Sequence, residues 1–282
     1  MGSQRYKVAI FRAAIFVACA MCCGAVHSTV LNTKSDIKGA SLISLGALPR
    51  SPEKGSLDSY CEGYRAKSLT AVGRQVAKLG WIVTSEGPLG RYRVVTFVSG
   101  FTPGTSAMCF ARNANIGIFD GAGLVALAYT SRSADGPLGT VEPLESGDLL
   151  VWSDPPGSPV GELHAEKNGL RLMAIEPTRT FCGRRAVVPN VYGKPIDAAR
   201  KILIAHSWRP LRPSEIPNDL NLAADFAKRG IIEAENCAGT GAGYCAFNYR
   251  SPAGVLHVTT AGGESEPADN SVVRYSVTCS AR

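Results

Sequence analysis

The sequence lacks the short motifs by which many enzymes and metalloproteins are recognised. Ser99, Ser106 and Ser133 stand outside the Gly-x-Ser-x-Gly context of a serine nucleophile. The glycine-rich stretch 239–243 lacks the Lys-Ser/Thr ending of a phosphate-binding loop. Lysine and arginine are spread along the chain, which argues against a nucleic-acid partner. These absences favour a binding or structural protein over an enzyme, and no cofactor is expected.

Acidic residues are also missing from the N-terminus, where the first one is Asp36. An uncharged apolar run occupies residues 13–26, and three basic residues precede it: Arg5, Lys7 and Arg12. This order is typical of a secretory signal peptide. We therefore expect a signal peptide over residues 1–28, with cleavage after Ser28 or, as the alternative, after Ala25.

Two other fates of this segment are left open. An uncleaved anchor would need roughly 20 apolar residues, whereas the run 13–26 has 14. A lipoprotein would be modified at Cys19, which follows residues that faintly resemble a lipobox. The short run favours cleavage, so we expect no stable membrane span in the mature protein.

The cysteines that remain after cleavage indicate an oxidising compartment. Cleavage leaves 254 residues (282 − 28), 27 basic against 23 acidic residues, and an even number of cysteines: Cys61, Cys109, Cys182, Cys237, Cys245 and Cys279. An even count is typical of a disulfide framework in a periplasmic or secreted protein. One pair, Cys237–Cys245, is predicted because the turn-rich stretch 238–244 lets its ends meet. The other pairings stay open. These six contain no C-x-x-C and no histidine at ligand spacing, so no metal site is expected.

Hydrophobic periodicity predicts two helices, each followed by strands. Apolar residues recur at helical spacing between Leu69 and Leu79, and again between Ile196 and Leu203. The stretches that follow are rich in β-branched and aromatic residues, as expected for strands. We therefore expect an α+β fold, β-rich overall, built from two related helix-plus-antiparallel-sheet units of βαββ type.

Composition suggests where these units begin and end. Residues 29–57 are polar and contain prolines, glycines and serines, so we expect a flexible tether there. The first α+β domain is expected over residues 58–181 and the second over residues 187–282. The mature chain is long enough for two such domains.

The two predicted units resemble each other. A shift of 127 positions (196 − 69) places Leu69 on Ile196 and Trp81 on Trp208 without a gap. Further along, a Gly-Thr pair followed by a cysteine recurs, at Cys109 and at Cys245. We interpret this as an internal duplication. A chance likeness of two amphipathic helices is the alternative.

Residues 188–193 read Val-Pro-Asn-Val-Tyr-Gly, and Ala198-Ala199 follow in the second predicted helix. This segment resembles the opening of a PASTA module, firmly over residues 187–208 and loosely over residues 187–262. It departs from that pattern in its cysteines and at Ser207, which stands where the family has glycine.

PASTA modules are envelope binding modules, often linked to peptidoglycan. The resemblance therefore implies a βαββ fold and, less directly, a cell-wall ligand, because a fold does not fix a function. The chain also resembles exported bacterial proteins of unassigned activity.

Two groups of residues are candidates for ligand binding. Trp208 could stack on a sugar ring, although core packing against a sheet is the alternative. Arg91, Tyr92 and Arg93 could grip an anionic polymer, although such short arginine clusters are often solvated surface.

Glu162, His164 and Glu166 alternate along a predicted strand, which places all three on one face. Such a trio could serve acid–base chemistry or bind a metal. A solvated strand face is the simpler interpretation, and no catalytic residue is assigned.

Export, disulfides and the missing catalytic motifs together predict an envelope binding protein. Its partner would be cell-wall polymer or another envelope protein, which it could inhibit. Two alternatives are an exported hydrolase whose site is not readable from motifs and a structural component of the envelope.

Overall fold

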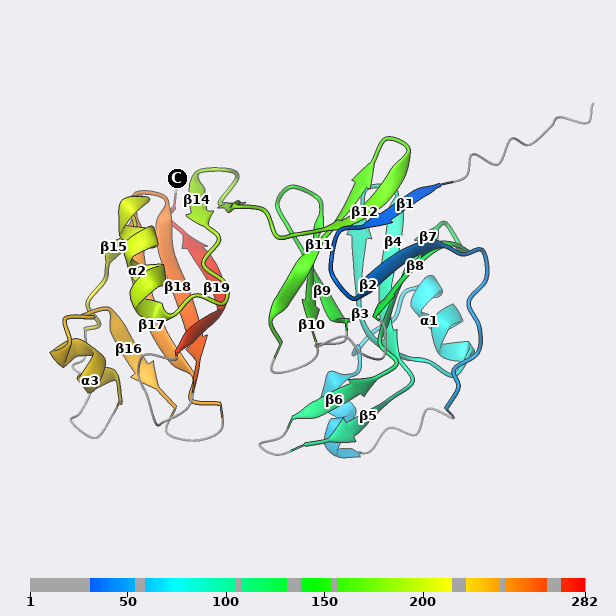
Figure 1. Cartoon of the computed structure of the whole chain (residues 1–282), viewed down its shortest axis with the longest axis horizontal. Helices are drawn as coiled ribbons and strands as arrows, with labels where there is room; N and C mark the ends of the chain where they lie inside the picture. The colour runs from blue at the N-terminus through cyan, green and yellow to red at the C-terminus, as the bar shows by residue number, and fades with distance from the viewer. Residues whose placement is uncertain are drawn as a thin grey trace, which may run out of the picture. The chain divides into compact units, whose positions relative to one another are not determined.

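The structure is a computed structural model that describes residues 31–53, 59–104, 108–130, 138–153, 157–214, 222–238, 242–262 and 270–281 (Figure 1). The predicted signal peptide, residues 1–28, lies outside the described residues. Within the described part of the chain, no helix is both long and apolar enough to cross a membrane.

The N-terminal part contains two five-stranded sheets. One has the order β1 (Asn32–Ser35), β12 (Gly169–Met173), β11 (Pro159–Glu166), β10 (Leu149–Ser153) and β9 (Leu138–Pro143). The other has the order β2 (Ala40–Ser44), β8 (Gly123–Thr130), β7 (Asn115–Asp120), β4 (Tyr92–Val98) and β3 (Ile82–Leu89). A two-stranded ribbon, β5 (Gly100–Pro103) with β6 (Cys109–Arg112), interrupts the second sheet's sequence between β4 and β7.

The two sheets bury their inner faces against each other. Val94, Ile116 and Ile118 from the second sheet share one buried cluster with Leu149 and Leu163 from the first. Inward-facing residues of two packed sheets form the core of a β-sandwich. Sheet-on-sheet packing therefore stabilises this part of the chain.

Strands β1 and β2 lie in the segment where a flexible tether was expected. β1 pairs in parallel with β12, and β2 pairs antiparallel with β8, so each is the edge strand of a different sheet (Figure 1). Their residues, NTKS and ASLIS, include few large apolar side chains because each strand has a solvent-facing side. The polar composition that suggested a tether is that of edge strands.

The C-terminal part has its own sheet, with the order β15 (Arg209–Pro210), β17 (Cys245–Ser251), β18 (Gly254–Ala261) and β19 (Ser271–Cys279). β16 (Ala234–Cys237) also pairs with β17, and a ribbon of β13 (Thr178–Phe181) with β14 (Ala186–Pro189) precedes the sheet. Its buried cluster contains residues from Cys182 to Tyr275, whereas three other clusters contain residues from Leu42 to Leu172. The predicted domain boundaries stay a prediction.

The expected α+β fold of two helix-plus-sheet units is wrong, because the described chain is about 50% strand and 14% helical. Its four helices are short: η1 (Ser59–Tyr64), α1 (Ala71–Lys78), α2 (Ile196–Ala205) and α3 (Leu222–Lys228). The two helical patterns were read correctly as α1 and α2. Pattern alone did not show that the two N-terminal sheets pack on each other and that α1 packs on the other face of the second sheet.

All six described cysteines form disulfides: Cys61–Cys109, Cys182–Cys279 and Cys237–Cys245. The predicted Cys237–Cys245 pair is present. The disulfides are compatible with an extracytoplasmic protein. Cys109 pairs with a cysteine upstream of α1, whereas Cys245 pairs with one downstream of α2, so the two cysteines that the duplication would equate have different partners. The duplication stays a prediction.

Candidate functional site

Both tryptophans that follow the predicted helices lie in cores. The indole Nε1 of Trp208 donates to the carbonyl of Val187 at 2.9 Å, and the side chain is 2% exposed. The indole Nε1 of Trp81 likewise donates to the carbonyl of Pro49 at 2.8 Å. Trp208 therefore presents no free face for stacking on a sugar in this structure.

The predicted arginine–tyrosine cluster lies at the turn between β3 and β4. Arg91 pairs with Asp120, with 3.2 Å between Nε and Oδ2, and its guanidinium lies over the ring of Tyr92. Tyr92 belongs to the sandwich core. Trp208 belongs to the C-terminal core, so the structure does not gather these predicted binding residues in one site.

The trio on β11 is divided. Glu166 pairs with Arg171, whereas Glu162 and His164 line a cavity of about 340 Å³ together with Asp148. His164 Nδ1 lies 3.2 Å from Asp148 Oδ1, and its Nε2 lies 3.3 Å from Glu162 Oε2. Glu162 is almost fully buried, and it accepts a hydrogen bond from the backbone N–H of Glu176 at 3.2 Å.

These carboxylates control the charge of His164. Glu162 first, and Asp148 with it, raise the pKa of His164, against burial, which lowers it. In the described part of the chain, no group of three or more His, Cys, Asp or Glu residues is arranged to hold a metal ion. The arrangement is that of an imidazole held between two carboxylates, which favour its protonated form.

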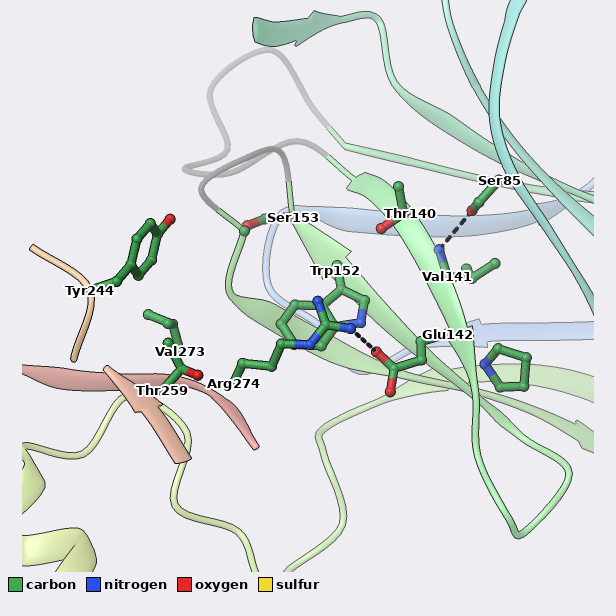
Figure 2. A pocket seen from close by; sticks show the side chains of 12 residues that line it. Ser85, Thr140, Val141, Glu142, Trp152, Ser153, Tyr244, Thr259, Val273 and Arg274 are labelled. Carbon is green, nitrogen blue, oxygen red and sulfur yellow. Dashed lines mark hydrogen bonds and ion pairs between the residues drawn. The ribbon is translucent and has the colours of Figure 1, made fainter. Parts of the chain in front are cut away.

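A second cavity, of about 710 Å³, is larger than the one at His164 (Figure 2). We call it the cleft. Part of its lining comes from β9, β10, the residue Gly157 after β10, and Ser85 of β3. The C-terminal sheet and Tyr244, the residue before β17, contribute the rest. The lining residues are Ser85, Thr140, Val141, Glu142, Pro143, Trp152, Ser153, Gly157, Tyr244, Thr259, Val273 and Arg274.

Trp152 and Arg274 form the central contact of the cleft. The Arg274 guanidinium lies 5.2 Å from the centre of the Trp152 ring, which is a cation–π distance. Figure 2 shows Arg274 extending across Trp152 to Glu142, where its Nη2 lies 3.1 Å from Oε2. Trp152 is 8% exposed, and its indole Nε1 is buried without a hydrogen-bond partner among the described residues.

Aromatic residues behind this contact hold Trp152 in place. Tyr192 meets it edge-to-face at 5.8 Å between ring centres and stacks on Tyr275 at 4.4 Å. Burial raises the pKa of Tyr192 to about 12, so its hydroxyl stays neutral and accepts a hydrogen bond from Arg179 at 2.7 Å. Aromatic pairs in these geometries stabilise their arrangement by about 0.5–1.5 kcal/mol each.

Tyr244 is the exposed aromatic residue of the cleft, with 39% of its surface accessible. It immediately precedes Cys245, whose disulfide to Cys237 anchors the segment. Its carbonyl accepts a hydrogen bond from the N–H of Ala238 at 2.7 Å. The ring is therefore presented to solvent from a constrained backbone.

β9 is the edge strand of its sheet and borders the cleft, and side chains of β3 form hydrogen bonds with its backbone. Ser85 Oγ accepts a hydrogen bond from the N–H of Val141 at 3.0 Å, and Thr84 Oγ1 donates to the carbonyl of Gly139 at 3.1 Å. Backbone groups of an edge strand that already form hydrogen bonds with side chains are not available to pair with a further strand. This argues against a peptide partner that would extend the sheet at β9.

No local pattern in the sequence indicates the cleft. Trp152 and Arg274 are 122 positions apart (274 − 152), on strands without a recognisable motif. Tyr244 lies in the turn-rich stretch, which was interpreted through its cysteines. Comparison with protein-family models, with curated proteins and with solved structures finds no match to this chain.

Proposed function

We propose that this protein is a periplasmic or secreted, disulfide-bonded binding protein of the bacterial envelope, and that its cleft binds cell-wall polymer. The observation that carries the proposal is the pairing of an exposed aromatic ring, Tyr244, with a positioned Trp152–Arg274 contact in one cavity. Ligand sites combine apolar surface with a few placed polar groups in this manner.

The other lining residues suit a polyhydroxylated ligand. Thr140, Ser153 and Thr259 line the cavity, and hydroxyls both donate and accept hydrogen bonds. A sugar ring has an apolar face for an aromatic side chain and hydroxyls for these groups. The PASTA-like resemblance agrees with a cell-wall ligand, but its firm part, residues 187–208, contributes no lining residue to the cleft.

Co-sedimentation of the purified, disulfide-bonded protein with isolated cell-wall sacculi tests the proposal. We expect saturable pelleting that persists at high salt, because stacking and short hydrogen bonds are screened far less than surface charge. Absence of pelleting, or its loss at modest salt, would contradict the proposal. Cross-linking would then show whether the partner is an envelope protein.

The cavity at His164 favours an exported hydrolase as the second candidate. It combines a buried Glu162 with His164 and Asp148, which are residue types used in acid–base catalysis. Hydrolysis of sacculi by the wild-type protein, and its loss in His164→Gln, would support this candidate. If sacculi are bound but remain intact, this result contradicts a hydrolase that acts on cell-wall polymer.

A further inference from the structure

Glu142 bridges two arginines at the edge of the cleft. Glu142 pairs with two cations, with Arg274 at 3.1 Å and with Arg179 at 3.6 Å. A single carboxylate therefore serves two guanidinium groups. Of the two arginines, Arg274 lines the cleft, whereas Arg179 lines the neighbouring acidic cavity. An anion that enters the cleft therefore meets Arg274.

The two arginines differ in how strongly the loss of their ion pair with Glu142 would destabilise the protein. The side chain of Arg179 is 6% exposed, whereas that of Arg274 is 64% exposed. Removing the partner of a buried charge is strongly destabilising, whereas an exposed ion pair contributes little to stability. Glu142 can therefore stay with Arg179 while Arg274 changes its partner at little cost.

Arg274 is also held in place for a ligand. Its contact with the Trp152 ring keeps the guanidinium at the cleft when the pair with Glu142 opens. A guanidinium binds a carboxylate through two parallel hydrogen bonds, which gives both strength and orientation. An exposed, positioned arginine in a cleft is thus suited to a carboxylate on the ligand.

We propose that the cell-wall polymer bound in the cleft carries carboxylates, and that Arg274 binds one of them by exchanging its ion pair from Glu142 to the ligand. Tyr244 and the hydroxyl-bearing residues Thr140, Ser153 and Thr259 contact the uncharged part of the same polymer chain. The inference rests on the proposed function and assigns the ligand chemistry at its site.

Sacculi with native carboxylates and sacculi whose carboxylates have been amidated provide the test. We expect the protein to bind native sacculi about tenfold more tightly than amidated ones, a difference of about 1.4 kcal/mol. Arg274→Gln should weaken binding to native sacculi by a similar factor and leave binding to amidated sacculi unchanged. Arg274→Lys should retain part of the preference, because lysine keeps the charge without the planar fork.

Arg229→Gln is the matched control variant. Arg229 also pairs with a carboxylate, Asp197 at 2.9 Å, and lies over an aromatic ring, that of Phe226. The Arg229→Gln variant should bind native and amidated sacculi with the same affinities as the wild type does. Equal binding of native and amidated sacculi by the wild type would overturn the carboxylate inference but leave the polymer-binding function standing. Binding to neither would overturn both.

Discussion

Among single residues, Glu233 is the most deeply buried charged residue of the described chain. Its side chain is fully buried, and Arg200 Nε lies 2.8 Å from its Oε1. Arg200→Met would leave a buried carboxylate without its counter-charge, so we expect the free energy of unfolding to fall by about 3–5 kcal/mol. Urea denaturation measures this directly.

Arg229→Met is the matched comparison, because Arg229 pairs with Asp197 where both side chains are well exposed, at 39% and 49%. We expect a loss of less than about 1 kcal/mol for that variant. Equal losses in the two variants would show that the burial of Glu233 does not determine the strength of its pair.

His164 should make stability depend on pH. The pKa of His164 is raised by Glu162 and Asp148 in the folded protein. Its stabilising contribution is therefore fully present below the pKa of the unfolded chain and is lost as the pH rises through the folded pKa. His164→Gln should destabilise the protein more at about pH 5 than at about pH 9.

Denaturation midpoints across this pH range, in the wild-type and Glu162→Gln backgrounds, measure the effect. Because Glu162 is the largest cause of the raised pKa, the pH dependence of the His164→Gln effect should shrink when Glu162 is replaced. A destabilisation that does not change with pH would contradict the account.

Alternation alone predicted part of this cluster. It placed Glu162 and His164 on one face of β11, as the structure does. It could not show that Asp148 meets them from the loop before β10, because that contact depends on the register in which β10 pairs with β11. The same limit hid the Trp152–Arg274 contact.

At the level of secondary-structure elements, the disulfides join segments that are separated by very different lengths of chain. Cys182–Cys279 joins residues 97 positions apart, from the segment after β13 to the end of β19, whereas Cys237–Cys245 spans 8 positions. Cross-links that close longer loops remove more entropy from the unfolded chain. Replacing the first pair with serine should therefore cost about 2 kcal/mol more than replacing the second.

Thermal or urea unfolding of Cys182→Ser/Cys279→Ser and Cys237→Ser/Cys245→Ser measures that difference. If the shorter loop costs as much as the longer one, loop entropy does not govern these bonds. The shorter pair should instead matter for ligand binding, because it anchors the segment that ends at Tyr244.

Helices α1 and α2 were predictable because each has a local period of apolar residues. Strands β1 and β2 were not, because an edge strand with one solvated side has the composition of a loop. The short Arg209–Pro210 strand likewise has no pattern of its own and exists through its pairing with β17. Local signals identified elements, and non-local pairing arranged them.

For the whole molecule, composition and cysteine number indicated a disulfide-bonded protein, and the three bonds agree with that. The sandwich was not predicted, since the choice between a helix layer and a second sheet depends on which apolar faces meet. The cleft follows from the same arrangement, because its lining combines β9 and β10 with β18 and β19.

Sacculus binding by Tyr244→Ala tests the assignment of the cleft most directly. Tyr60→Ala is its control, because Tyr60 is also an exposed tyrosine, at 51%, on η1 and outside the residues that line the cleft. Loss of a stacking ring should raise the half-saturation concentration about tenfold for Tyr244→Ala, with no change for Tyr60→Ala. If Tyr244→Ala pellets with sacculi as the wild type does, the cleft is not where the polymer binds.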